Sequence, residues 1–234
     1  APDPLTEAQW ASFVKAQFTE DGAPIDMTVM GHTLPVLDLS GSMLDNGAIY
    51  IALFVGAAMM YPEGNPGFVL TFGASVHTVP LRFGSSEEMR AHLEGNRLVQ
   101  PCDVDAMVQH PETLWTTLKL IKAGGGHAVE YNATRWDLVV KRAAAIACGG
   151  VRISKIVGIS DMKMDNPSAL RLDAGSVCVE GVNEMAERIW RDEMARRGQD
   201  MPTPVQVYWN AACVGGEKYV ASPDTPNVIQ FNGP

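Results

Sequence analysis

The chain has 234 residues, of which 46% are hydrophobic and 19% are charged, and its formal net charge at pH 7 is −9. This length and composition are typical of an α/β domain of ordinary size with a full hydrophobic core. A net negative charge disfavours direct nucleic-acid binding, and the sequence has no apolar stretch of about eighteen residues, which excludes a membrane span of the usual kind.

The first 29 residues are predicted to form a helical extension, ahead of an α/β domain at 30–234. Thr6 and Gln9 have the spacing of a capping box, and Trp10, Phe13 and Val14 follow with the spacing of one helix face. We expect this helix to begin near Thr6 and to end near residues 21–22.

The domain itself is predicted to alternate strands with helices. In chain order we expect a strand at 33–38, a helix at 46–61 and strands at 68–72 and 76–81. A helix capped by Ser85 or Ser86 should follow, then helices at 112–122 and 132–147. A strand at 153–159, a helix at 184–197 and strands at 204–209 and 227–231 complete the domain. The short link at 73–75 contains glycine, so the strands beside it should form a hairpin. The remaining alternation predicts a doubly wound, mostly parallel, Rossmann-like sheet flanked by helices, with one antiparallel edge hairpin.

Polar side chains follow two of these strands. Asp38, Ser40 and Ser42 form a D-x-S-x-S motif after the first strand, and Asp161 follows the strand at 153–159. Thr134 stands at the start of the helix between them in sequence. In an open α/β sheet these positions meet at the carboxyl edge, where ligands bind. Two carboxylates and three hydroxyls are hard oxygen donors, which suit Mg²⁺, or Mn²⁺ or Ca²⁺, better than zinc.

The same five residues resemble the von Willebrand factor type A (vWA) domain and its metal-ion-dependent adhesion site (MIDAS). That family's motif is D-x-S-x-S followed by a distant Thr and a distant Asp. Asp38, Ser40, Ser42 and Asp161 match it, although the family's usual Thr-Asp-Gly is Ser160-Asp161-Met162 here. Thr134 takes the place of the distant Thr, and Thr116 and Thr117 are alternatives for it. Among vWA domains, the region from the helix at 184–197 onward is most similar to the C-terminal domain of an uncharacterised family. That family occurs in eukaryotes and large DNA viruses and is related to the Ro ribonucleoprotein.

The resemblance implies a binding module rather than an enzyme. In the family the hydroxyls contact the metal, the Asp carboxylates often act through water, and an Asp or Glu of a protein partner completes the shell. A final helix usually follows the last strand, whereas this sequence stops at Pro234, so we expect a piece of a longer protein.

Three other interpretations remain open. The D-x-S-x-S segment has the composition of an ordinary turn or helix cap. The chain could instead be a structural subunit of a larger viral or ribonucleoprotein assembly, with a vestigial or fold-stabilising metal site, or a metal-dependent phosphoester hydrolase. A serine hydrolase is disfavoured, because no G-x-S-x-G elbow surrounds either serine. The four cysteines are widely spaced and no secretory signal is visible, so we expect reduced thiols and an intracellular location, or a virion if the protein is viral.

Overall fold

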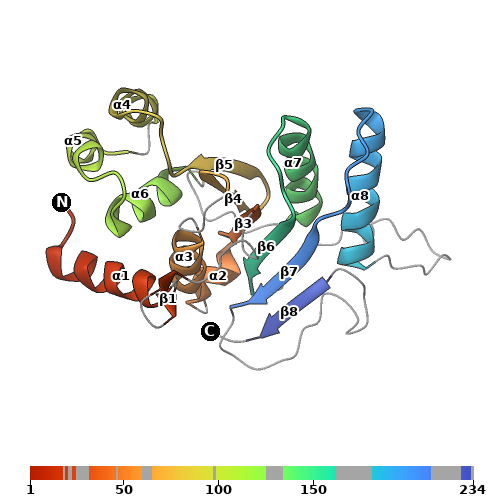
Figure 1. Cartoon of the computed structure of the whole chain (residues 1–234), viewed down its shortest axis with the longest axis horizontal. Helices are drawn as coiled ribbons and strands as arrows, with labels where there is room; N and C mark the ends of the chain where they lie inside the picture. The colour runs from red at the N-terminus through yellow and green to blue at the C-terminus, as the bar shows by residue number, and fades with distance from the viewer. Residues whose placement is uncertain are drawn as a thin grey trace.

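A six-stranded sheet forms the centre of the protein (Figure 1). The computed structural model describes residues 1–17, 19–20, 23–24, 32–45, 47–59, 65–96, 99–124, 134–161, 181–211 and 228–232. The strands of the sheet are β3 (Thr33–Asp38), β4 (Phe68–Phe72), β5 (Val76–Pro80), β6 (Lys155–Ser160), β7 (Val205–Asn210) and β8 (Val228–Asn232). Their spatial order is β5-β4-β3-β6-β7-β8, and β1 (Thr19–Glu20) and β2 (Ala23–Pro24) form a separate antiparallel pair.

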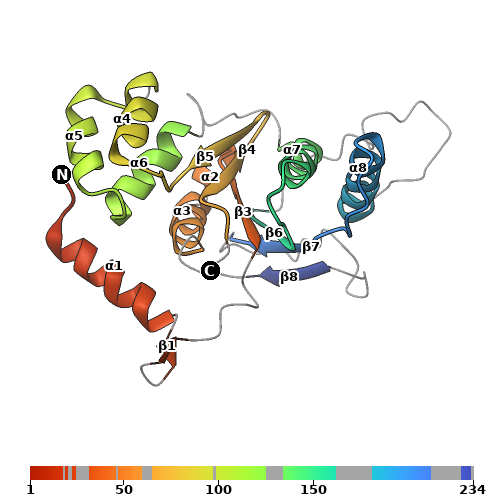
Figure 2. The same cartoon turned by 45° about the horizontal axis from the view of Figure 1, so that its top comes forward.

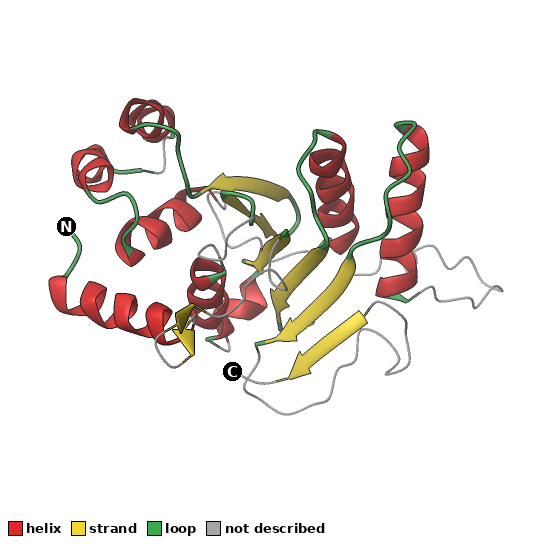
Figure 3. Cartoon of the chain, in the orientation of Figure 1, coloured by secondary structure: helices red, strands yellow, loops and turns green. Residues whose placement is uncertain are grey.

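The pairing confirms the predicted fold class. All neighbouring strands of the large sheet run parallel except β4 and β5, which form the antiparallel hairpin at one edge. The helices are α1 (Pro4–Gln17), α2 (Gly41–Asp45), α3 (Ala48–Ala58), α4 (Ser86–Gly95), α5 (Pro101–Gln109), α6 (Leu114–Gly124), α7 (Trp136–Cys148) and α8 (Val182–Arg196). No helix in the described part of the chain is both long and apolar enough to span a membrane. The arrangement is a Rossmann-like α/β fold, with strands and helices distinguished by colour in Figure 3.

Helices cover both faces of the sheet, as Figures 1 and 2 show. Leu34 and Val36 of β3 point toward α7 and α8 and belong to a core that includes Trp136 and Trp190. Leu37 points to the opposite face and belongs to a second core with residues of α2, α3, α4, α5 and α6. Successive side chains of a strand alternate between faces, so a strand buried on both sides reads as the continuous apolar run seen before Asp38.

The structure corrects one local prediction, confirms a second and adds a helix. Helix α1 begins at Pro4, and the cap is Asp3 rather than Thr6: an Asp3 carboxylate oxygen accepts from the Thr6 amide at 2.8 Å and from the Thr6 hydroxyl at 2.6 Å. Ser85 caps α4 by accepting from the Glu88 amide at 3.1 Å, as predicted. Helix α5, which begins with Pro101, was not predicted.

Helix α1 lies within the region predicted as the N-terminal extension and packs on the rest of the protein. The Glu7 carboxylate accepts hydrogen bonds from the backbone amides of Leu114 at 2.8 Å and Trp115 at 2.9 Å. These amides open α6 and have no partner within the helix, so Glu7 acts as an N-cap contributed from another helix. Trp10 adds an edge-to-face contact with Phe54 of α3, with ring centroids 4.8 Å apart.

Gly158 of β6 is required by the position of Trp136, whose indole ring packs directly on the strand. A Cβ at residue 158 would lie 2.6 Å from that ring, which is fully buried and has no free space to move into. We expect Gly158→Ala to lower the free energy of unfolding by about 1–3 kcal/mol, measured by urea denaturation. The matched control is Gly95→Ala in α4, where an added Cβ would meet no atom within 4 Å. An equal loss in both variants would contradict this explanation.

Candidate metal centre

Asp38 lies at the carboxyl end of the central strand β3, and both of its carboxylate oxygens accept hydrogen bonds. One oxygen accepts from the Ser40 backbone amide at 2.8 Å, and the other accepts from the Ser160 hydroxyl at 2.6 Å. The side chain is completely buried. Asp38 is therefore held in one orientation by the turn that follows its own strand and by the end of the neighbouring strand.

Ser40 and Ser42 lie on that turn, where the chain enters α2. Their hydroxyl oxygens are 3.3 Å apart, so the two side chains of the motif point to a common place. The Met43 amide donates to the Ser40 carbonyl at 3.1 Å and closes the turn. Ser40 is 4% exposed, and Ser42 is partly exposed, which leaves the hydroxyl pair open on the Ser42 side.

Asp161 follows β6 in the same way that the serine turn follows β3. The parallel register pairs Leu37 with Ile159, so Ser160 stands level with Asp38 and Asp161 lies one step beyond. The negative charge of Asp161 is close enough to act on Asp38. The predicted convergence of the two carboxylates at one edge of the sheet is therefore found in the structure.

Burial raises the pKa of Asp38 to about 6, and the charge of Asp161 adds to the increase. Hydrogen bonds from Ser160 and Ser40 oppose it, because they favour the charged form. The buried carboxylate is thus costly to ionise next to a second one. A divalent cation at this edge would offset that cost, since it supplies the opposite charge.

Thr134 is brought to the same edge by the start of α7. The Arg135 amide donates to the Gly73 carbonyl at 2.9 Å, directly after β4, and Phe72 of β4 is level with Asp38. Thr134 is 5% exposed. The alternatives Thr116 and Thr117 lie within α6, where their hydroxyls donate to the carbonyls of His110 at 2.7 Å and Thr113 at 3.0 Å. Of the three threonines, Thr134 is the one that lies at the carboxyl edge of the sheet, next to the end of β4.

Arg135 and Asp137 form an ion pair at the first turn of α7. Arg135 donates to both oxygens of the Asp137 carboxylate, at 2.7 and 2.8 Å, and Lys141 lies 3.7 Å from it. Burial pushes the pKa of Asp137 up, but the hydrogen bonds and charges of Arg135 and Lys141 outweigh it and leave the pKa below its ordinary value. Asp137 thereby neutralises the positive charge of Arg135, the residue that follows Thr134 in the sequence.

Ser160 is the residue at this edge whose role the sequence analysis missed. It was treated as a neighbour of Asp161, yet its hydroxyl makes the shortest hydrogen bond to Asp38. The available signal was the strand register, since two adjacent parallel strands that end in polar residues bring those residues level. Asn210 continues the row, because it pairs with Ser160 at the end of β7.

The donor set fits a small hard cation better than a soft one. Asp38 and Asp161 supply carboxylate oxygens, and Ser40, Ser42 and Thr134 supply hydroxyls, as Mg²⁺ and Ca²⁺ prefer. Within the described ranges, no group of three or more His, Cys, Asp or Glu side chains is arranged to hold a metal. An ion at this edge would therefore depend on the hydroxyls as much as on the carboxylates.

The fold and this edge define a Rossmann-like α/β protein with an acidic, hydroxyl-rich rim at the carboxyl ends of its central strands. Comparison with models of known protein families finds no match for the chain, and comparison with curated proteins finds none either.

Proposed function

We propose that the chain is a metal-dependent protein-binding module of the vWA type, with Mg²⁺ at a MIDAS-like site formed by Asp38, Ser40, Ser42, Thr134 and Asp161. The observation that carries the proposal is the hydrogen bonding of the Asp38 carboxylate. Both of its oxygens already accept hydrogen bonds, from Ser40 and Ser160. This favours a carboxylate that acts on a metal through water, while the serine hydroxyls face the ion.

That arrangement supports binding of an acidic partner. A cation whose direct protein ligands are neutral hydroxyls keeps most of its positive charge, and carboxylates one shell further out hold it in place. Such a cation attracts one more carboxylate, which an Asp or Glu of a partner protein can provide. Direct ligation by both Asp38 and Asp161 would weaken this attraction, because the site would then be neutral before the partner arrives.

The binding of Mg²⁺ alone tests the site. We expect calorimetric titration with MgCl₂ to give a saturable heat with the native protein, and Ser40→Ala to weaken the affinity by about tenfold or more. Ser154→Ala is the matched control, since Ser154 precedes the amino end of β6, whereas the candidate site lies at the carboxyl end of that strand. Loss of affinity in both variants, or no Mg²⁺ binding by the native protein, would contradict the proposal. The second result would favour a structural subunit with a vestigial site.

The acidic partner is tested with the loaded protein. Immobilised protein in Mg²⁺ should retain short glycine-rich peptides that contain one Glu and have little tendency to form a strand. It should not retain the same peptides with Gln, and it should release the bound ones in EDTA. Hydrolysis of phosphate esters that Asp161→Ala abolishes would instead support the enzyme alternative.

A further inference from the structure

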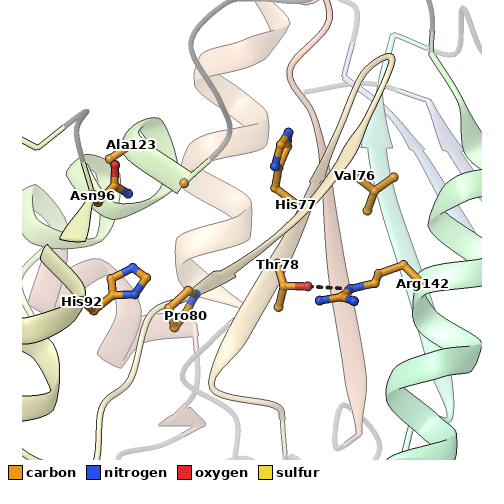
Figure 4. Close-up of a pocket in the computed structure, with 9 residues that line it drawn as sticks. Val76, His77, Thr78, Pro80, His92, Asn96, Ala123 and Arg142 are labelled. Atoms are coloured by element: carbon orange, nitrogen blue, oxygen red, sulfur yellow. Dashed lines mark hydrogen bonds between the residues drawn. The ribbon is translucent and has the colours of Figure 1, made fainter.

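The outer edge of β5 carries the inference. Among the strands that the structure describes, β5 is the outermost of the sheet and pairs with β4 alone. A pocket of about 530 Å³ lies along it (Figure 4). Its walls come from β5 itself, from the ends of α4 and α6, and from Arg142 of α7. Residues of β5 from both faces line the pocket, including His77 and Thr78, so the pocket encloses the strand's edge rather than one face.

The hydrogen-bonding pattern identifies which backbone groups of β5 point into this space. The Leu81 amide donates to the Gly67 carbonyl at 2.8 Å, and the Gly73 amide donates to the Ser75 carbonyl at 3.0 Å. In an antiparallel pair, directly hydrogen-bonded positions alternate with the others, so residues 75, 77, 79 and 81 direct their backbone groups toward β4. Val76, Thr78 and Pro80 therefore direct theirs outward, and Val76 and Thr78 supply outward N–H groups.

The titratable side chains of the pocket are basic. Among the described residues that line it they are His77, His92 and Arg142, and none of those residues is acidic, in a chain whose net charge is −9. His77 is held by the Ser75 hydroxyl at 2.9 Å, and the His92 ring lies against Phe83 with centroids 5.3 Å apart. The pocket thus differs in charge from the acidic rim at the ends of β3 and β6.

Arg142 is aimed at the centre of the open edge. Its Nε donates to the Thr78 hydroxyl at 2.9 Å, which fixes the guanidinium beside the outward backbone groups of the same residue. Within the described residues this is the single hydrogen bond or ion pair of Arg142, so both terminal nitrogens remain available. In Figure 4, Arg142 and His92 approach the strand from opposite sides.

We propose that the edge of β5 is a docking site for an extended, acidic peptide segment of a partner, which adds to the sheet as a further strand. Its backbone pairs with the outward groups of Val76, Thr78 and Pro80, and an Asp or Glu opposite Thr78 is held by Arg142. Residues opposite each other in adjacent strands point to the same face, so that carboxylate meets the free guanidinium nitrogens. This is the strand-addition mode of peptide recognition.

Charge distinguishes this occupant from a second copy of the chain. The strand β5 has the sequence Val-His-Thr-Val-Pro, without a carboxylate, so pairing of two β5 edges would bring two Arg142 side chains together and satisfy neither. The site is also independent of the metal proposal, since it uses no residue of the candidate metal centre. The two are separated by carrying out this test in EDTA.

The probe is a labelled, end-blocked peptide Thr-Val-Thr-Glu-Val-Thr-Val, titrated in EDTA and followed by fluorescence anisotropy. We expect saturable binding below about 1 mM, a loss of roughly tenfold or more for the peptide with Gln in place of Glu, and the same loss for Arg142→Gln. Arg191→Gln on α8 is the control for net charge, because Arg191 is exposed and lies on another helix; it should bind like the native protein.

Hydrogen exchange supplies a readout that does not depend on any variant. The peptide should slow the exchange of the Val76 and Thr78 amides, and leave the already paired His77 and Val79 amides almost unchanged. Val76→Pro removes one outward N–H at an edge position that tolerates proline, and it should weaken binding strongly. Val76→Ala is its control, because it loses the same packing on the core but keeps the N–H, and it should still bind. Absence of saturable binding would overturn the proposal. Binding that ignores Arg142, or dimerisation through β5, would equally overturn the proposal.

Discussion

Asp38→Asn is expected to make the metal-free protein more stable at about pH 8, by on the order of 3 kcal/mol. The pKa of Asp38 is raised from 3.8 to about 6 because the side chain is buried and faces Asp161. The folded state therefore holds a proton that the unfolded state releases between these two values, and stability is lost as the pH rises through this window. Asparagine is neutral at every pH and keeps a carbonyl oxygen for the Ser40 amide. Urea unfolding of both proteins without metal measures the difference.

The pH dependence makes this expectation specific. The advantage of Asp38→Asn should be complete above about pH 6, should shrink as the pH falls, and should vanish below 3.8, where the carboxyl is protonated in both states. Asp192→Asn is the control, since Asp192 is 68% exposed in its pair with Arg188 and should change stability by no more than about 0.5 kcal/mol. If Asp38→Asn were less stable at all pH values, the hydrogen bonds of the carboxylate would outweigh its burial.

The fold was largely predictable because its signals are local. The strand at 33–38 is an uninterrupted apolar run bounded by a polar turn, and the observed β3 has the same limits. The hairpin of β4 and β5 follows from two short strands with a glycine-containing link, and Ser85 caps α4 as its type suggests. The start of α1 was predicted wrongly, because the capping-box spacing favoured Thr6 as the cap, whereas Asp3 caps the helix and accepts from the Thr6 amide.

The sequence predicted that the candidate residues share one edge of the sheet, but it did not predict the energetics of that edge. The positions of Asp38, Ser40, Ser42 and Asp161 after strands indicated a shared edge, because carboxyl ends of parallel strands coincide. The Ser160 contact depends on strand register, and the raised pKa of Asp38 depends on complete burial between helices far away in sequence. The pocket along β5 was not predicted, because Arg142 reaches Thr78 from 64 residues away in the sequence.

Stabilisation by Mg²⁺ should be greatest above about pH 6 and should shrink steadily below it, and this is the second large effect that the site predicts. The metal requires the charged form of Asp38, whereas the metal-free folded state retains its proton up to about pH 6. Mg²⁺ must therefore displace a proton at lower pH, and its affinity should fall by about tenfold for each pH unit below that value. At a Mg²⁺ concentration about 100 times the dissociation constant, binding adds about 2.7 kcal/mol, which for this chain length is a rise in Tm of roughly 5–10 °C.

Thermal melts with and without MgCl₂ across this pH range provide the measurement, and Asp38→Asn provides the control. The variant should show little Mg²⁺ response at any pH, because it can neither release a proton nor offset the charge of the ion. Its higher metal-free stability and its missing metal response have one cause, the loss of a buried negative charge. A native response that stays constant from about pH 5 to 8 would mean that Mg²⁺ binds away from Asp38, since only a site coupled to that carboxylate competes with its proton. The two experiments together therefore separate a cation site at the ends of β3 and β6 from a polar turn that happens to have the same residues.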